Sequence, residues 1–494
     1  MQAREQVVSD VTIGGARIST EHFIANRRVG SPRTFDVHSP LDGALLGSFA
    51  AGGKNEAEQA VAAAEAAFPA WAALGPAGRA VYLHRLAGLI EKNVEPLALV
   101  ETTNNGSLLE SGRLRVMKRA AHNIRFFCEM AEKLQGAQWD TEIANATNRV
   151  KYDPAGVTML ITPWNAPLML ATWKIGPALA AGNTVVLKPA EWTPLTASML
   201  ADLALEAGLP AGVFNLVQGI GEEAGAALVA DPRVKRISFT GSTGTARLIG
   251  ASAARNLTPV SFELGGKSPF IVFADADFDL ALQNAIGQYD NAGQVCLAGT
   301  RLLVEASIYE KFLLRMKEEA AKIRLGDSRD PQTQVGPLIT TEHLQRVDGF
   351  VQRAVRDGAR LVYGGRVSPK FGGLYYEPTL FADVQPGAEI LKQEVFGPVL
   401  TIQPFRDESE AIQLANDTEY GLAATLFTRD SSRAERVADQ LVAGTVWTNC
   451  FFVRDLAAPF GGSRHSGIGR EGGHWSFDFY CDVKNVVYRK GTFA

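Results

Sequence analysis

One cysteine of the sequence lies in surroundings that suit a reactive thiol. Cys296 is part of the segment GQVCLAG at 293–299, where small residues leave room around the sulfur and let backbone N–H groups approach a bound molecule. A cysteine in this setting can act as a nucleophile, although a buried structural cysteine would have similar neighbours. Cys128, Cys450 and Cys481 lie among aromatic residues, which favours a structural role for each of them.

Two other residues could assist a nucleophile at Cys296. Glu263 follows an apolar run and precedes two glycines, so it could lie in a cleft where loss of water raises the pKa of a carboxyl group toward that of a useful base. Asn165 lies in PWNAP at 163–167, whose prolines fix the backbone and could aim the side-chain amide at a developing negative charge. An ion pair for Glu263 and an ordinary turn for Asn165 are the alternatives.

Glycine-rich segments suggest places where a phosphate could bind. The sequence has no Gly-x-Gly-x-x-Gly after its first predicted parallel strand, but 219–225 and GSTGTA at 241–246 could each bring backbone N–H groups near phosphate. Lys188 and Glu191, in KPAE, come at the carboxyl end of a predicted strand, where ligands of open parallel sheets bind. They could hold two ribose hydroxyls, or form a solvated ion pair.

The elements that must position these residues alternate between strands and helices. Short apolar, β-branched runs predict strands at 157–161, 184–187, 213–217, 236–239 and 270–273. A helical pattern at 195–207 separates two of them, and a second block has strands at 301–304 and 399–405 and a helix at 309–323. Before them, 55–74 and 79–103 predict an all-helical opening. We therefore expect an α/β fold with two parallel-sheet lobes joined near 262–269.

Composition excludes several other classes of protein. The chain has 494 residues, of which 46% are hydrophobic, and 49 Lys plus Arg against 53 Asp plus Glu give a net charge of −4. This balance argues against a surface for nucleic acid or an anionic membrane. The cysteines form no C-x-x-C pair, which argues against a zinc site and favours a reducing compartment such as the cytoplasm. The first ten residues lack the apolar core of a signal peptide, and the apolar stretch 167–187 is interrupted by Lys174 and Pro177.

Seven motifs occur in an order that resembles the aldehyde dehydrogenase family over essentially the whole chain. They are PWNAP, KPAE, GSTGTA, ELGGK, GQVC, EVFGP and PFGG. The resemblance is specific in spacing, with 98 residues from Asn165 to Glu263 and 33 from Glu263 to Cys296. It implies that Cys296 attacks the aldehyde carbon, that Asn165 and the backbone N–H of Cys296 hold the oxyanion, and that Glu263 activates the water that releases the acid. The non-enzymatic members of such a fold would be expected to lack the nucleophile or the base.

The resemblance also implies NAD as cofactor, no metal, and a three-part architecture. The residues expected to contact NAD are Ile161, Thr162, Trp164, Lys188, Glu191, Gly221, Gly225, Phe239, Gly241, Ser242, Leu264, Glu394 and Phe396. The expected domains are an NAD-binding domain at 1–134 and 155–262, a catalytic domain at 263–464, and an oligomerisation arm at 135–154 and 478–494. A homodimer or homotetramer follows from the same resemblance.

Within that family, NCFFVRDL at 449–456 and SGIGREGG at 466–473 resemble the hydroxymuconic and aminomuconic semialdehyde dehydrogenases. Their substrates carry a carboxylate away from the aldehyde, so an arginine pair makes chemical sense. Arg454 matches the arginine of that loop, and Arg119 matches a second arginine less distinctively. A salt bridge of Arg454 with Asp455 and a solvated helix face for Arg119 are the alternatives.

Trp173 and Phe452 are expected to complete the substrate site. NNGS at 104–107 departs from the Asp-Thr-Gly-Lys common in the subgroup, which leaves the size and shape of the substrate open. The competing substrate class is betaine aldehyde or a general aliphatic aldehyde. A quaternary ammonium group would need an aromatic cage, and Arg454 would repel it.

Overall fold

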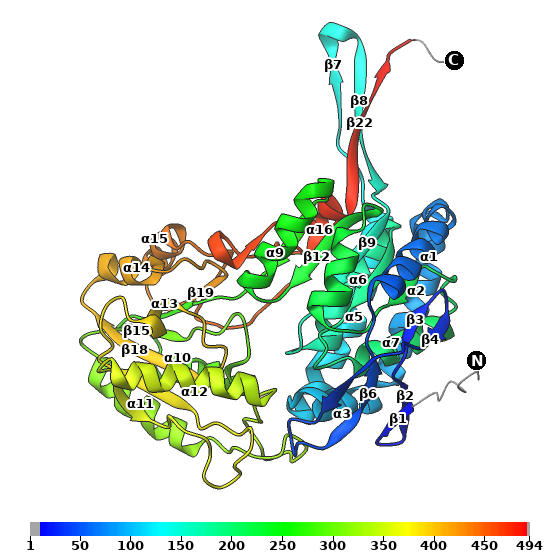
Figure 1. Ribbon diagram of the computed structural model, residues 1–494. Coiled ribbons are helices and arrows are strands. Elements are labelled where there is room, and N and C mark those ends of the chain that lie inside the picture. Colours follow the sequence, from blue (N-terminus) through cyan, green and yellow to red (C-terminus); the bar gives the residue numbers. More distant parts are fainter. Residues whose placement is uncertain (1–9, 492–494) are drawn as a thin grey trace.

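The computed structural model describes residues 10–491 and consists of two α/β lobes and a projecting arm (Figure 1). Residues 1–9, where no signal peptide is expected, and 492–494, the last residues of the expected arm, lie outside the described residues. No helix within 10–491 is long and apolar enough to cross a membrane. The same residues contain no group of three or more His, Cys, Asp or Glu side chains that could hold a metal ion.

The first lobe is built on an eight-stranded sheet with the order β21-β13-β12-β9-β10-β11-β3-β4. Its five central strands are parallel: β9 (Val157–Ile161), β10 (Thr184–Lys188), β11 (Phe214–Leu216), β12 (Val234–Thr240) and β13 (Val260–Glu263). The edge strands β3 (His22–Ile24), β4 (Arg27–Val29) and β21 (Gly467–Ile468) are antiparallel. β9, β10 and β11 are buried throughout, as expected for parallel strands covered on both faces.

Helix α6 (Pro167–Ala181) is the most deeply buried helix against this sheet, and buried charges contact both of its ends. Glu101, on α3 (Val94–Asn105), accepts a hydrogen bond from the Leu168 N–H at 3.0 Å. Arg79, on α2 (Gly75–Lys92), donates from Nε to the Ala180 carbonyl at 3.1 Å. A carboxylate at the first turn and a cation at the last turn both complement the helix dipole. The lobe also contains α1 (Lys54–Ala73), α5 (Met117–Lys133), α7 (Leu195–Glu206) and α9 (Thr243–Ala253).

The second lobe has a seven-stranded sheet with the order β16-β17-β18-β15-β14-β19-β20. Six strands are parallel: β14 (Pro269–Val272), β15 (Arg301–Glu305), β17 (Thr379–Ala382), β18 (Val399–Phe405), β19 (Ala423–Phe427) and β20 (Thr445–Thr448). Only β16 (Arg360–Tyr363), at the edge, is antiparallel. The helices of this lobe include α10 (Phe278–Ile286), α11 (Tyr309–Lys322), α12 (Thr341–Arg356), α14 (Glu408–Asn416) and α15 (Ser431–Gln440).

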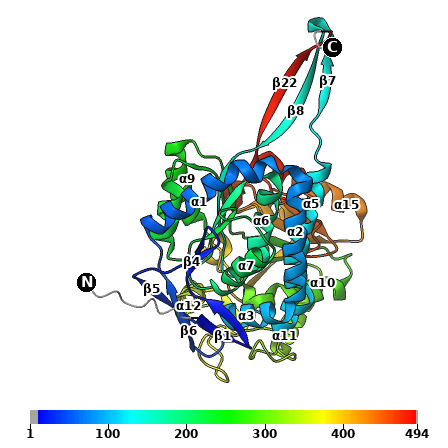
Figure 2. The same ribbon diagram turned by 90° about the vertical axis from the view of Figure 1, so that its right-hand side faces the viewer.

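The arm is a three-stranded antiparallel sheet that projects from the body in both views (Figures 1 and 2). It consists of β7 (Gln138–Thr141), β8 (Ala146–Pro154) and β22 (Cys481–Arg489), and α16 (Gly473–Tyr480) leads into β22. β8 lies in the first third of the chain and β22 near its end, so the arm joins segments that are far apart in the sequence.

The predicted α/β fold class is confirmed, and the strands at 157–161 and 399–405 have the predicted bounds. The prediction of an all-helical opening is incomplete, because antiparallel strands precede α1. They include β1 (Asp10–Ile13), β2 (Ala16–Ser19), β5 (Thr34–His38) and β6 (Leu45–Ala50). These strands are short and partly polar, so they give little periodic signal. Gly14-Gly15 between β1 and β2 was a hairpin signal that could have found the first pair.

Candidate active site

Cys296 lies where the two lobes meet, in a segment whose backbone packs tightly. Its side chain contacts the core cluster of the first lobe, although it precedes β15 of the second lobe. A Cβ at Gly266 would lie 2.6 Å from the Cys296 carbonyl oxygen, and a Cβ at Gly293 would lie 2.1 Å from the Gly397 carbonyl oxygen. The glycines of ELGGK and GQVC are therefore needed for this close backbone approach.

The thiol of Cys296 lies in a site that disfavours its charged form. Burial, followed by the nearby side chains of Glu394 and Glu263, raises the pKa of the Cys296 thiol to about 12, while Arg454 opposes them. At neutral pH the thiol is therefore protonated. A reaction that needs the thiolate must supply a base or a substrate that stabilises the charge.

Glu263 is the residue of the site best suited to act as a base. It ends β13, its side chain is 5% exposed, and neither carboxylate oxygen has a hydrogen-bond partner among residues 10–491. Burial, followed by the charge of Glu471, raises the pKa of Glu263 well above its usual value. An unpaired buried carboxylate costs free energy, and a raised pKa in a cleft is typical of a catalytic acid or base.

A buried ion pair lies beside Glu263. Lys174 Nζ on α6 donates to Glu471 Oε1 at 2.8 Å and to Ser238 Oγ at 2.8 Å. Trp173 Nε1 donates to Glu471 Oε2 at 2.5 Å. Sequence reasoning noted Lys174 only as an interruption of an apolar stretch and missed Glu471, because nothing local in either segment indicates the partner.

Asn165 is held against the segment that carries the thiol. Its Nδ2 donates to the Gln294 carbonyl at 2.9 Å, and Asn291 Nδ2 donates to the Asn165 carbonyl at 3.3 Å. Gln294 lies two residues before Cys296, so the amide and the thiol belong to one locally rigid unit. One N–H of the Asn165 amide is thereby used, and the second can serve another acceptor.

Several residues expected to contact a dinucleotide meet at the carboxyl ends of β9, β10 and β12. Thr162, after Ile161, donates its backbone N–H to the Lys188 carbonyl at 3.2 Å. Lys188 Nζ donates to Glu191 Oε2 at 3.1 Å, and the charges of Glu191 and Glu222 partly offset the burial that lowers its pKa. A Cβ at Gly225 would lie 3.8 Å from Lys188 Cδ, whereas a Cβ at Gly221 would meet no atom within 4 Å.

The second phosphate candidate also lies close to the base. Ser242 caps helix α9 by accepting the Thr245 N–H at 3.2 Å. The Gly241 N–H donates to the Glu263 carbonyl at 3.0 Å. A Cβ at Gly241 would lie 2.4 Å from the Phe239 ring, so this turn also requires glycine.

The remaining residues expected to contact NAD are Glu394, Phe396, Trp164 and Leu264. Glu394 Oε1 accepts the Gly266 N–H at 3.1 Å, and burial raises the pKa of Glu394 to about 7. The rings of Trp164 and Phe396 meet edge to face with centroids 5.3 Å apart. Leu264 is buried and donates its N–H to the Ser466 carbonyl at 2.9 Å.

Two residues of α12 that sequence reasoning missed hold the segment 394–396. Arg346 donates to the Glu394 carbonyl at 2.6 Å, and the His343 ring contacts the Phe396 carbonyl at 2.7 Å. The two residues are three apart on one helix face, and this spacing was the signal that could have indicated their shared role. The same spacing is common on solvated helix faces.

Arg454 lies over aromatic rings and has no carboxylate partner. Its guanidinium carbon is 3.6 Å from the centroid of the Phe460 ring and 5.0 Å from that of Trp173. Within the described residues it forms no ion pair, so the alternative of a salt bridge with Asp455 is not observed. Burial, followed by the charge of Arg119, lowers the pKa of Arg454 to about 10.

The structure brings Arg119 close to Arg454 but leaves Phe452 outside. Arg119, on α5, is partly buried and donates from Nε to Asn123 Oδ1 at 3.1 Å, so it is not on a fully solvated helix face. The side chain of Phe452 is 44% exposed and its φ is +62°. Trp173, Arg454 and Arg119 thus form one group near the thiol, and Phe452 lies at its surface.

A half-buried thiol, a buried carboxylate without a hydrogen-bond partner in residues 10–491 and an anchored amide lie together, an arrangement suited to forming a covalent bond to a carbonyl carbon. Residues 28–486 match the model of the aldehyde dehydrogenase family. The chain therefore belongs to this family, which confirms the resemblance in its motifs, and it is an oxidoreductase that acts on aldehydes.

Known proteins resemble the chain over nearly its whole length. It is 42% identical over 476 residues to the 2-aminomuconic semialdehyde dehydrogenase of Danio rerio, covering 95% of this chain and 98% of that one. It is also 42% identical over 489 residues to the phenylacetaldehyde dehydrogenase of Pseudomonas fluorescens, covering 96% and 97%. A crystal structure of betaine aldehyde dehydrogenase from Staphylococcus aureus with NAD+ has a TM-score of 0.93 and 38% identity, covering 97% and 96%.

We expect Glu394 to make the stability of the protein depend on pH. Because its pKa is about 7 in the folded state against 4.5 ordinarily, folding favours its protonated form. The resulting stabilisation is complete below about pH 4.5 and is lost as the pH rises through about 7. Glu394→Gln, which cannot titrate, should lose roughly 3 °C less in Tm than the wild type across this window. Thermal unfolding without cofactor measures Tm as a function of pH. Glu206→Gln, on the exposed face of α7, is the control. Parallel curves of Tm against pH for the wild type and both variants would contradict the prediction.

Proposed function

We propose that this enzyme oxidises a muconic-type semialdehyde, an aldehyde with a distal carboxylate, to the carboxylic acid with NAD as cofactor. The observation that carries the substrate class is the unpaired guanidinium of Arg454 beside Cys296 and Glu263. A buried cation without a carboxylate partner is costly unless a ligand supplies one. The muconic relative at 42% identity supports the same class.

The residues present fit a dinucleotide. Lys188 with Glu191 would hold the adenosine ribose, Gly225 leaves space beside them, and Ser242 opens helix α9 toward a phosphate. NAD+ in the betaine aldehyde dehydrogenase structure supports this cofactor. When bound, the nicotinamide accepts the hydride that leaves the substrate carbon. We assign cofactor binding to 1–134 and 155–262, and the reaction to 263–464.

The residues of the chain perform the remaining chemistry. The Cys296 thiol releases its proton to solvent, and Sγ forms a bond to the aldehyde carbon while the carbonyl oxygen gains the electron pair. The free N–H of the Asn165 amide and the backbone N–H of Cys296 donate to this oxyanion. After oxidation the acyl group is held as a thioester. Glu263 takes a proton from water, whose oxygen attacks the acyl carbon; the C–S bond breaks, giving the acid and the thiol.

Betaine aldehyde is the less favoured substrate. Its quaternary ammonium group would lie near Arg454 and Arg119, and like charges repel in a site from which water is largely excluded. Phe460 and Trp173 could form part of an aromatic cage, but the guanidinium of Arg454 already covers both rings.

Replacing the nucleophile and the base should separate the two halves of the reaction. Cys296→Ala should abolish aldehyde oxidation and retain NAD binding, because the thiol is lost and the cofactor residues are not. Glu263→Gln should form about one NADH per site and then stall as the thioester, because only the water-activating base is missing. Stopped-flow absorbance of NADH and titration of NAD by fluorescence measure these effects. Unchanged steady-state turnover in either variant would refute the assigned roles.

Arg454 should discriminate between charged and uncharged aldehydes. A charge-assisted hydrogen bond contributes roughly 1.5 to 3 kcal/mol, so Arg454→Ala should lower kcat/KM for a muconic semialdehyde about ten- to a hundred-fold. The value of kcat/KM for hexanal, which has no carboxylate, should fall much less. Arg454→Lys should recover only part of the loss, because an ammonium group lacks the planar two-point contact. Arg255→Ala, at an exposed position just after α9, is the control. Equal losses on both aldehydes would show that Arg454 is only structural.

We also propose that the arm, predicted as 135–154 and 478–494, joins copies of this chain into a homodimer or homotetramer in the cytoplasm. Trp139 is 50% exposed and Ile143 fully exposed on this thin sheet, which has no core of its own. All four cysteines are free thiols, in keeping with a reducing compartment.

Charges placed on the arm should therefore separate the copies. The double variant Trp139→Glu, Ile143→Glu should sediment as a single 53.1 kDa chain, because burying two carboxylates at an interface is unfavourable. Leu314→Glu, an exposed apolar position on α11, should keep the mass of the wild type. A monomeric wild type, or a double variant of unchanged mass, would contradict the proposal.

A further inference from the structure

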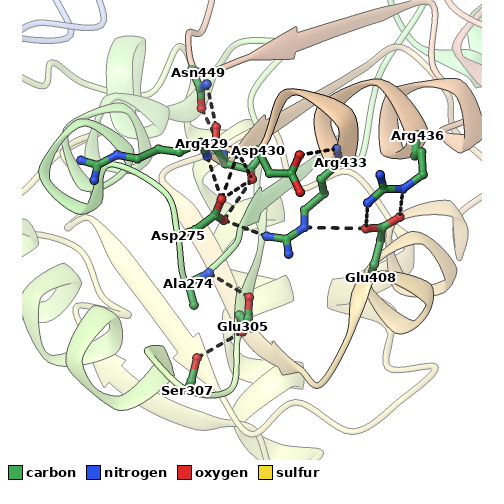
Figure 3. A network of polar contacts seen from close by, with 11 residues as sticks. Ala274, Asp275, Glu305, Ser307, Glu408, Arg429, Asp430, Arg433, Arg436 and Asn449 are labelled. Carbon is green, nitrogen blue, oxygen red and sulfur yellow. Dashed lines mark hydrogen bonds and ion pairs between the residues drawn. The ribbon is translucent and has the colours of Figure 1, made fainter.

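A polar cluster in the second lobe is centred on Asp275, in the segment between β14 and α10 (Figure 3). Asp275 Oδ2 accepts the hydroxyl of Thr428 at 2.8 Å and the backbone N–H groups of Arg429 at 3.0 Å and Asp430 at 3.1 Å. Asp275 Oδ1 accepts from Arg433 at 2.8 Å. Burial raises the pKa of Asp275, but these hydrogen bonds and Arg433 outweigh it and leave the pKa below its usual value. The carboxylate thus fixes the turn that follows β19.

Asn449 attaches the end of β20 to this fixed turn. Its Oδ1 accepts the Thr428 N–H at 3.0 Å and its Nδ2 donates to the Thr428 carbonyl at 2.9 Å, so the amide pairs with both backbone groups of one residue. Its own N–H donates to the Leu426 carbonyl at 2.8 Å. The φ of Asn449 is +55°, a left-handed conformation that asparagine tolerates better than most residues. Figure 3 shows Asn449 next to the Asp275 cluster.

The loop that starts at Asn449 carries Arg454. Trp447, the residue before the last of β20, donates from Nε1 to the Val453 carbonyl at 2.8 Å, and the ring of Phe451 packs on Trp447 with centroids 5.3 Å apart. The direction of the chain at Asn449 therefore sets where the backbone next to Arg454 lies. A displacement of the guanidinium by about 1 Å is enough to change rates substantially in a preorganised site.

We propose that Asn449, held by the Asp275 cluster, is a positioning residue that sets the preference of the site for a carboxylated aldehyde through Arg454. The proposal rests on the function proposed above for Arg454. The side-chain hydrogen bonds of Asn449 go to the backbone of Thr428, and they direct the loop 449–456 so that the guanidinium lies over Phe460 and Trp173.

Asn449→Gly is the decisive variant, because glycine adopts a φ of +55° without strain and lacks both amide hydrogen bonds. It should lower the ratio of kcat/KM for a muconic semialdehyde to kcat/KM for hexanal about three- to ten-fold, mainly by raising KM for the charged aldehyde. Asn449→Asp, which keeps the acceptor for the Thr428 N–H, should recover part of the ratio. Asp275→Asn should act in the same direction with a smaller effect.

Asn416→Gly is a matched control. Asn416 forms the same kind of amide pairing, donating to the Gln440 carbonyl at 2.8 Å and accepting the Val442 N–H at 2.8 Å, but this pairing does not lead to the loop of Arg454. Asn416→Gly removes two equivalent hydrogen bonds from the same lobe, so the ratio of the two kcat/KM values should stay at the wild-type value.

The Arg454→Ala background separates the two proposals. If Asn449 acts through Arg454, Asn449→Gly should change the ratio no further in that background. The positioning role alone would be overturned if Asn449→Gly lowered the ratio equally with and without Arg454. It would also be overturned if Arg454→Ala lowered the ratio but Asn449→Gly left it unchanged. A ratio unaffected by Arg454→Ala itself would overturn the proposed function instead.

Discussion

The site depends on helix α6, which is fixed at both ends by buried charges. Glu101 meets its first turn and Arg79 its last turn, so the helix can neither slide nor rotate without breaking charge-assisted hydrogen bonds. The Asn165 segment leads directly into it. Trp173 lies under Arg454, and the following Lys174 binds Glu471 beside Glu263. One rigid helix therefore lies next to Asn165, Arg454 and Glu263, the residues proposed as oxyanion donor, specificity residue and base.

Charge is distributed around the thiol so that no single group acts alone. Glu394 and Glu263 raise the pKa of Cys296, and Arg454 opposes them. The pKa of Glu263 is itself raised by burial and Glu471, and lowered by Lys174 and Arg454. A carboxyl group whose pKa is raised in this way accepts a proton more readily than a solvated one. The same surroundings therefore disfavour the thiolate of Cys296 and make Glu263 a stronger base.

The sequence predicted those strands and site residues that leave a local pattern in the chain. The parallel strands were predictable because burial on both faces demands continuous apolar runs, and the motifs around Asn165, Glu263 and Cys296 were recognisable because glycine and proline fix their backbones. The strands before α1 were missed because short polar hairpins lack periodicity. Glu471, His343 and Arg346 were missed because their partners lie far away in sequence, as with Lys174 and Glu471, 297 residues apart. Such pairs exist only after the fold has brought them together.

If Arg454 binds the substrate carboxylate as proposed, recognition and reactivity are not separable in this site, because its charge also acts on Cys296 and Glu263. Its charge favours the Cys296 thiolate and the Glu263 carboxylate in the free enzyme. A substrate carboxylate paired with the guanidinium would neutralise much of that charge, so the thiol of the complex is less acidic with a carboxylated aldehyde than with a neutral one. The less acidic thiol is also the stronger nucleophile once it has lost its proton. A variant that retains the charge, such as Arg454→Lys, therefore keeps the electrostatic part of the role and loses only the geometric part.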